Sequence, residues 1–106
     1  EAAAAVGAFM DRVKSKNPGR RYVVGHNVSF DTAFIRRLYM LADKRCPKEF
    51  LFNRSIDTHS MLYLRNDPTS LDAALSKYKI STDSLRHTAL TDAKLTAALY
   101  KRITSD

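Results

Sequence analysis

Two carboxylates and a histidine occupy positions from which they could share one hydrolytic site. Asp31 ends the expected loop 26–31, which follows a short apolar run, and Asp92 lies five positions after His87. Carboxylate oxygens are the ligands that Mg²⁺ and Mn²⁺ prefer in proteins. A histidine can take a proton from an attacking water near neutral pH. Together the three residues supply parts of a metal-dependent hydrolase.

Taken alone, each of these segments also has a purely structural interpretation. Ser29 and Asp31 are residue types favoured at a helix N-cap. Asp92 could lie on the solvent side of a helix start, with His87 as an exposed loop residue. Only the combination of the two segments indicates chemistry.

A third segment, residues 56–59, reads Ile-Asp-Thr-His. Asp57 follows an expected strand and could line the same crevice, but we favour a capping role for it at the start of the next helix. His59 has no partner that the sequence reveals, and we expect it on the surface or on a helix face.

Apolar periodicity predicts the elements that would position these residues. Helices are expected over 2–16, 31–45, 58–64, 71–78 and 88–103, and strands over 22–24 and 54–56. In the second helix the apolar stripe would be Phe34, Leu38 and Leu41, with Ile35 and Tyr39 beside it. Pro47 would begin a loop. This order predicts an α/β fold with a short parallel sheet of about two strands and about five helices.

The expected geometry explains how the charged residues could meet. Asp31 would follow the carboxyl end of a parallel strand, where open α/β sheets bind ligands. Positions five apart on a helix point about 140° away from each other, so His87 must precede the helix for it to converge with Asp92. A ridge of small residues would let this helix lie close to the sheet and leave Asp92 half-buried. The ridge residues are Ala89, Ala93 and Ala97.

Composition limits the class of protein. The 106 residues suffice for one domain, and 44% hydrophobic and 27% charged residues are ordinary for a globular protein. No apolar run approaches a membrane span of about 20 residues. The single Cys46 excludes an internal disulfide framework, and we expect a cytoplasmic location. The formal net charge of +7 favours an anionic partner, with nucleic acid as the common one. A basic protein without such a partner is the alternative.

Residues 24–31, Val-Gly-His-Asn-Val-Ser-Phe-Asp, resemble the second motif of DnaQ-like, DEDDh-type 3′–5′ exonucleases. Residues 87–92 match the third motif of that family, His-x-Ala-x-x-Asp. The segments 56–58 and 70–78 also look like the family's intervening segments. The resemblance implies an RNase H-like fold that removes nucleotides from the 3′ ends of DNA or RNA with two Mg²⁺ or Mn²⁺ ions. Some relatives in this family are proofreading subunits.

The resemblance also implies roles for individual residues. Asp92 would be a direct metal ligand, and Asp31 would support the second metal through water. His87 would be the general base that activates the attacking water. The residues close to a single-stranded or 3′-terminal nucleic-acid substrate would be His26, Asn27 and Phe30.

One motif of that family is absent. The family carries an Asp-x-Glu pair on an earlier strand, whereas the only glutamates here are Glu1 and Glu49, and neither has an aspartate two positions before it. We therefore expect residues 1–106 to form a single, incomplete exonuclease domain that lacks this strand region and is inactive alone. Its open strand edge at 22–24 would invite pairing with another copy or with an N-terminal segment.

A non-catalytic protein is the alternative from another class. It would be a nucleic-acid-binding module or a degenerate exonuclease fold, and the missing Asp-x-Glu pair is its best support. The joint presence of Asp31, His87 and Asp92 argues against it.

Overall fold

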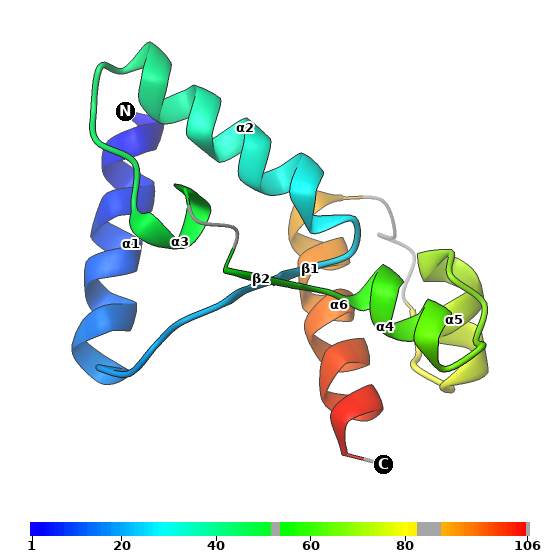
Figure 1. The fold of residues 1–106 in the computed structure, drawn as a ribbon. Coiled ribbons are helices and arrows are strands. Elements are labelled where there is room, and N and C mark those ends of the chain that lie inside the picture. Colours follow the sequence, from blue (N-terminus) through cyan, green and yellow to red (C-terminus); the bar gives the residue numbers. More distant parts are fainter. Residues whose placement is uncertain (52–53, 83–87, 106) are drawn as a thin grey trace. The chain divides into compact units, whose positions relative to one another are not determined.

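The computed structural model describes residues 1–51, 54–82 and 88–105, which form two strands and six helices (Figure 1). In chain order they are α1 (Ala2–Lys16), β1 (Val23–Gly25), α2 (Val28–Leu41), α3 (Lys48–Leu51), β2 (Ser55–Asp57), α4 (Thr58–Leu64), α5 (Leu71–Lys77) and α6 (Ala89–Thr104). The strands pair in a two-stranded parallel sheet, which confirms the predicted α/β class. Among the described helices, none combines the length and apolar character needed to cross a bilayer.

The chain divides into two compact units. The first unit comprises Glu1–Val23 and Val28–Ile56, and the second comprises Val24–Asn27 and Asp57–Asp106. The division passes through both strands, so that each strand contributes residues to both units. Inside the first unit, the backbone N–H of Val23 donates to the carbonyl oxygen of Arg54 at 2.8 Å.

In the first unit the end of α2 lies against the start of α1. Lys44, just beyond α2, forms an ion pair with Glu1. Helix α3 also contacts α2, and the Arg36 guanidinium donates to the carbonyl oxygen of Phe50 at 2.8 Å. Buried apolar residues of this unit are Ala3, Val28, Tyr39 and Phe50. These contacts assemble three helices around a small core.

Helix α2 ends at Leu41, four residues before the predicted end. Asp43 adopts a positive φ of 54°, and its N–H donates to the Met40 carbonyl at 3.1 Å. The Lys44 N–H donates to the Tyr39 carbonyl at 3.0 Å. These two bonds form a Schellman motif, which satisfies carbonyl groups that the helix end would leave unpaired. Lys44 therefore lies beyond the end of the helix.

The buried face of α2 also differs from the predicted stripe. The buried residues are Val28, Thr32 and Tyr39, whereas Phe34 and Leu41 are 65% and 70% exposed. Successive residues turn by about 100°, so Leu41 lies about 200° from Tyr39 on the opposite side of the helix. Apolar residues occur on both sides, and the contacts with α1 and α3 decide which side is buried.

Helix α3 was predicted as loop. It is a single turn of four residues after Pro47, whose carbonyl accepts from the Phe50 N–H at 3.1 Å. Such a short helix shows no apolar periodicity in the sequence. This turn accounts for the sixth helix in the described part of the chain, against about five predicted.

The second unit is built on capped helices around an apolar core. The core residues are Leu62, Ala74, Leu75, Leu99 and Ile103. The predicted cap at Ser70 is confirmed, because its hydroxyl accepts from the Ala73 N–H at 3.2 Å. Helix α4 has the predicted bounds, and α5 and α6 start within one residue of them. Local signals were sufficient here because each helix carries its own start residue.

Asp67 ties the loop after α4 to the end of α5. Its carboxylate accepts hydrogen bonds from the Lys77 ammonium and from the Tyr78 hydroxyl. Its side chain is 6% exposed. These partners lower the pKa of Asp67, first the hydrogen bond from Lys77 and then that from Tyr78, while burial opposes them.

Leu62→Ala should lower the free energy of unfolding by about 2–5 kcal/mol, the usual cost of deleting a buried leucine side chain. Leu62 is 0% exposed. Leu64→Ala is the matched control, because Leu64 lies on the same helix and is 83% exposed; it should change the free energy by less than about 0.5 kcal/mol. Urea unfolding followed by circular dichroism measures both. Equal losses of unfolding free energy in the two variants would contradict the burial of Leu62 in this core.

Asp67→Asn should reduce stability at neutral pH but lose that effect in acid. The native pKa lies below the usual value of about 3.9, so the ionised carboxylate stabilises the native state above pH ~4. This stability is lost as the pH falls through the native pKa. The difference in Tm between wild type and variant should therefore shrink from pH ~5 to pH ~3. A difference independent of pH would contradict the assignment.

Candidate functional site

Asp57 ties the turn after β1 to the start of α4. Its Oδ1 accepts from the Asn27 N–H and from the His59 N–H, each at 2.9 Å. The bond to His59 makes Asp57 the N-cap of α4, which confirms the predicted capping role. Asn27 has a positive φ of 61°, a conformation that asparagine tolerates better than most residues. The Asp57 carboxylate thus fixes the backbone of Asn27, which is a predicted substrate-binding residue.

His26 is held by the start of the same helix. Its Nδ1 lies 2.9 Å from the Thr58 Oγ1, which in turn lies 3.2 Å from the Gly25 carbonyl oxygen. A carbonyl oxygen only accepts, so both contacts are hydrogen bonds only if Thr58 donates to Gly25 and His26 Nδ1 donates to Thr58. Nδ1 then carries the proton, and in the neutral ring Nε2 is the acceptor.

The sequence analysis assigned no role to Thr58 and found no partner for His59, which lies on α4 within the predicted helix. The His59 ring lies 5.6 Å from the His26 ring, centroid to centroid, with the planes tilted by 60°. Thr58 is 0% exposed. No spacing in the sequence signals this pair of histidines, because the strand pairing brings His26 and His59 together from segments 33 positions apart.

Asp31 and Phe30 lie in the first turn of α2. The helix begins at Val28, so neither Ser29 nor Asp31 is its N-cap, and the capping interpretation is wrong for both. Asp31 is exposed, and Phe30 is 77% exposed. The Asp31 carboxylate and the Phe30 ring therefore lie on the surface of the first unit.

Asp92 lies in the first turn of α6, as the motif requires. Thr88 caps this helix, because its Oγ1 accepts from the Thr91 N–H at 3.2 Å. Asp92 is half-buried, so it does not lie on the open solvent side. His87 directly precedes the cap in the sequence and lies outside the described residues.

The small-residue ridge beside Asp92 does not pack as predicted. Its members are exposed: Ala89, Ala93 and Ala97. The buried face of α6 is formed instead by Thr96, Leu99 and Ile103. Leu99 lies about 200° around the helix from Ala97, which places it on the other side.

The predicted residues are divided between the two units. Asp31 and Phe30 belong to the first unit, and His26, Asn27 and Asp92 belong to the second. Hydrogen bonds within the second unit bring Asn27 to Asp57 and His26 to Thr58.

The described residues do not by themselves fit a two-cation site. The part of the chain that the structure describes contains no group of three or more histidine, cysteine or acidic residues that could hold a metal ion. The carboxylates of Asp31 and Asp92 have the right donor chemistry for Mg²⁺ or Mn²⁺. With about six oxygen ligands per Mg²⁺ ion, these two carboxylates would leave most positions of an ion pair to water, substrate and further side chains.

Comparisons with known proteins give one finding. A family model with the description RNase_T, Exonuclease, matches residues 7–100. No curated protein and no solved structure matches the chain. The matched range includes residues 24–31 and 87–92, the segments that contain Asp31 and Asp92.

Asp57→Ala should lower the free energy of unfolding by about 1–3 kcal/mol, because it removes an N-cap and leaves two backbone N–H groups without their acceptor. Asp57→Asn is the matched control, since its side-chain oxygen can still accept both bonds, and it should retain at least half of that stability. Thermal unfolding of both variants measures the difference. Equal effects would contradict the hydrogen-bonding role.

Proposed function

Because this chain belongs to the exonuclease family, we propose that it carries the second and third motifs of a metal-dependent 3′–5′ exonuclease of the DEDDh type. The enzyme would have an RNase H-like fold and would remove nucleotides from the 3′ ends of DNA or RNA by two-metal hydrolysis. The observation that carries the proposal is the family match over residues 7–100, which runs through both motif segments.

The proposed roles follow the donor chemistry of the residues. Asp92 would ligate one cation directly, and Asp31 would support the other through water. His87 would take the proton of the attacking water on its imidazole. The position of Asp92 in the first turn of a helix that starts just after His87 supports this assignment, because residues five apart converge only when the first precedes the helix.

Substrate contacts would come from the turn after β1. Asn27 has its backbone fixed by Asp57, and His26 has its ring fixed by Thr58. Side chains held in this way lose little freedom when they bind. Phe30 is 77% exposed, and an exposed aromatic ring can stack on a base of a single strand.

The missing acidic pair would come from a strand outside these 106 residues. Tyr22 and Val24, at the open edge of β1, are 49% and 37% exposed, and an unpaired strand edge accepts a further strand. A groove of about 590 Å³ in the first unit lies beside this edge. Its apolar lining includes Val6, Phe9, Val13, Tyr22 and Val23. We place the strand that bears the Asp-x-Glu pair here.

A non-catalytic nucleic-acid-binding module is the second candidate. One observation favours it: the 106 residues contain no Asp-x-Glu. Such a module would bind nucleic acid through its positive charge without cleaving it.

The full-length gene product should shorten a 5′-labelled single-stranded oligonucleotide from its 3′ end in Mg²⁺ or Mn²⁺. Asp31→Asn, His87→Ala and Asp92→Asn should each lower the rate at least about 10²-fold, because members of a coupled catalytic set fail together. A gel assay of labelled products measures rate and direction at once.

Asp72→Asn is the matched control for the two aspartate variants. Asp72 also lies in the first turn of a helix, but outside both motifs, and this variant should keep the wild-type rate. Wild-type activity in all three motif variants would refute the assigned roles. Binding of the oligonucleotide without any shortening in either metal would favour the non-catalytic module.

A further inference from the structure

Helix α2 has a second apolar face, which is left largely exposed. This outward face is formed by residues that recur every three or four positions: Phe30, Phe34, Arg37 and Leu41. At about 100° per residue, the four positions fall within about 60° of one another around the helix. Phe30 is 77%, Phe34 is 65% and Leu41 is 70% exposed. Exposed apolar residues that gather on one face, unlike scattered ones, mark a surface that binds a partner.

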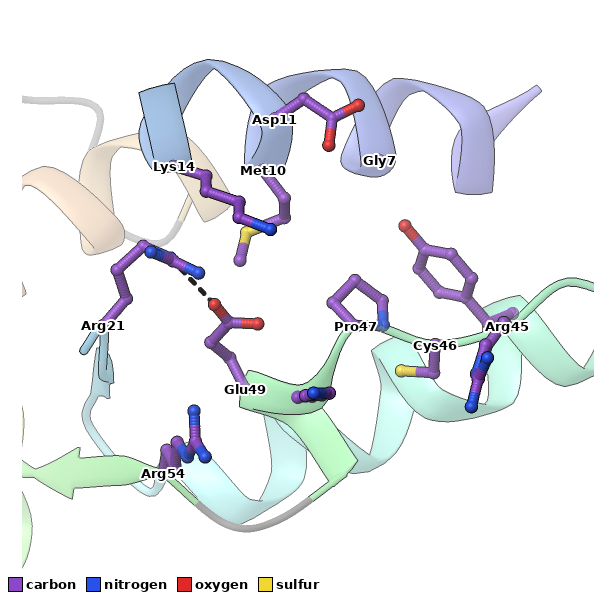
Figure 2. A pocket seen from close by; sticks show the side chains of 12 residues that line it. Gly7, Met10, Asp11, Lys14, Arg21, Arg45, Cys46, Pro47, Glu49 and Arg54 are labelled. Carbon is purple, nitrogen blue, oxygen red and sulfur yellow. Dashed lines mark hydrogen bonds and ion pairs between the residues drawn. The ribbon is translucent and has the colours of Figure 1, made fainter. Parts of the chain in front are cut away.

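The opposite face of α2 is already used inside the first unit. Tyr39 is buried there beside Gly7 of α1. On the same inner side, Arg21 forms an ion pair with Glu49 at 2.9 Å, drawn as a dashed line in Figure 2. A partner of α2 must therefore approach from the outward face.

The charge on the outward face is positive. Of the three charged residues of α2, Asp31, Arg36 and Arg37, Arg36 donates to the carbonyl oxygen of Phe50 at 2.8 Å. Arg37 is exposed, and within the described residues it takes part in no ion pair. No acidic residue occupies the outward face or the flanking positions 33 and 40. An uncompensated cation between apolar side chains complements an anionic partner.

The aromatic rings indicate which anionic partner this is. Phe30 and Phe34 are neighbours on successive turns, about 6 Å apart along the helix axis. Bases of a single strand stack on such rings, and cations beside the rings hold the phosphates. A duplex keeps its bases within its own stack, where the rings could not reach them. The formal net charge of +7 disfavours a second copy of this chain, because like charges repel.

We infer that the outward face of α2 binds single-stranded nucleic acid, with one base stacked on Phe34 and a phosphate at Arg37. The face begins at Phe30, next to Asp31 in the sequence, and extends about 16 Å to Leu41. The direction of the strand rests on the proposed function: its 3′ end would lie at Asp31, and the preceding nucleotides would follow the helix. Binding itself does not require cleavage.

Fluorescence anisotropy of a 5′-fluorescein-labelled oligothymidylate, mixed with the full-length gene product in EDTA, measures this binding without cleavage. Phe34→Leu keeps an apolar side chain but removes the ring, and should weaken the affinity about fivefold or more, the effect of losing one stacked base. Phe34→Tyr keeps the ring and should retain the wild-type affinity. Both variants should keep the wild-type Tm, because Phe34 is largely exposed.

Tyr63→Leu is the matched control for the ring. Tyr63 is 73% exposed on α4, outside the outward face of α2, and this variant should leave the affinity unchanged. Wild-type affinity in Phe34→Leu, or equal losses in Phe34→Leu and Phe34→Tyr, would overturn the stacking role.

The salt dependence of the same binding tests the phosphate contact. Arg37→Gln should reduce the slope of log Kd against log salt by about 0.7, the value for one phosphate of a single strand. Arg12→Gln is the matched control, because Arg12 is an exposed arginine of α1 that lies over the Phe9 ring at 5.9 Å. It should keep the wild-type slope. An unchanged slope in Arg37→Gln would contradict the contact.

Sedimentation separates nucleic acid from a second copy as the partner. The molar mass of the gene product without nucleic acid should be the same in the wild type and in Phe34→Leu. A wild-type dimer that Phe34→Leu dissociates would assign the outward face to self-association and refute the inference.

The binding assay and the cleavage assay can fail separately. Metal-dependent shortening by the wild type, together with full affinity in Phe34→Leu, would leave the exonuclease intact and refute binding along α2. Weaker binding by Phe34→Leu, with no shortening by the wild type in Mg²⁺ or Mn²⁺, would support binding along α2 and refute the catalytic role.

Discussion

The hydrogen bonds to the Asp57 carboxylate hold together the turn after β1 and the start of α4, the part of the candidate site that carries His26 and Asn27. Asp57 stands where β2 ends and α4 begins, and Oδ1 accepts one N–H from the turn after β1 and one from the first turn of α4. The adjacent Thr58 fixes the His26 ring from the same position. A two-stranded sheet is marginally stable by itself. These hydrogen bonds therefore help to hold the ends of two strands that have only three residues each.

The further strand that we propose would account both for the open edge of the sheet and for the small number of metal ligands. A sheet of two strands has an unpaired edge on each side. Exposed apolar residues lie at the unpaired edge of β1. The described residues also contain no group of three or more histidine, cysteine or acidic residues that could hold a metal ion. A single further strand that carries an acidic pair would cover the edge, fill the apolar groove beside it and supply the missing ligands.

Helix α2 connects the proposed catalytic carboxylate to the packing of the first unit. Its first turn carries Asp31 and Phe30, both of which are exposed. Near its other end it carries Tyr39, whose buried side chain lies beside Gly7 of α1. The Schellman motif at Asp43 ends the helix, and the segment that follows leads into α3. The contacts of one end of α2 with α1 therefore help to fix the helix whose other end carries Asp31.

The sequence alone determined the elements that local chemistry specifies. Ser70 and Asp57 cap helices where they were predicted to, because a cap depends on a few neighbouring residues. The two motif segments likewise indicated the exonuclease family through their resemblance to its motifs. Tertiary structure decided the rest. Tertiary contacts bury Tyr39 and leave Leu41 exposed. The segment predicted as a loop forms α3, and the His59 ring lies next to the His26 ring. Each of these depends on partners distant in the chain, which periodicity and spacing do not contain.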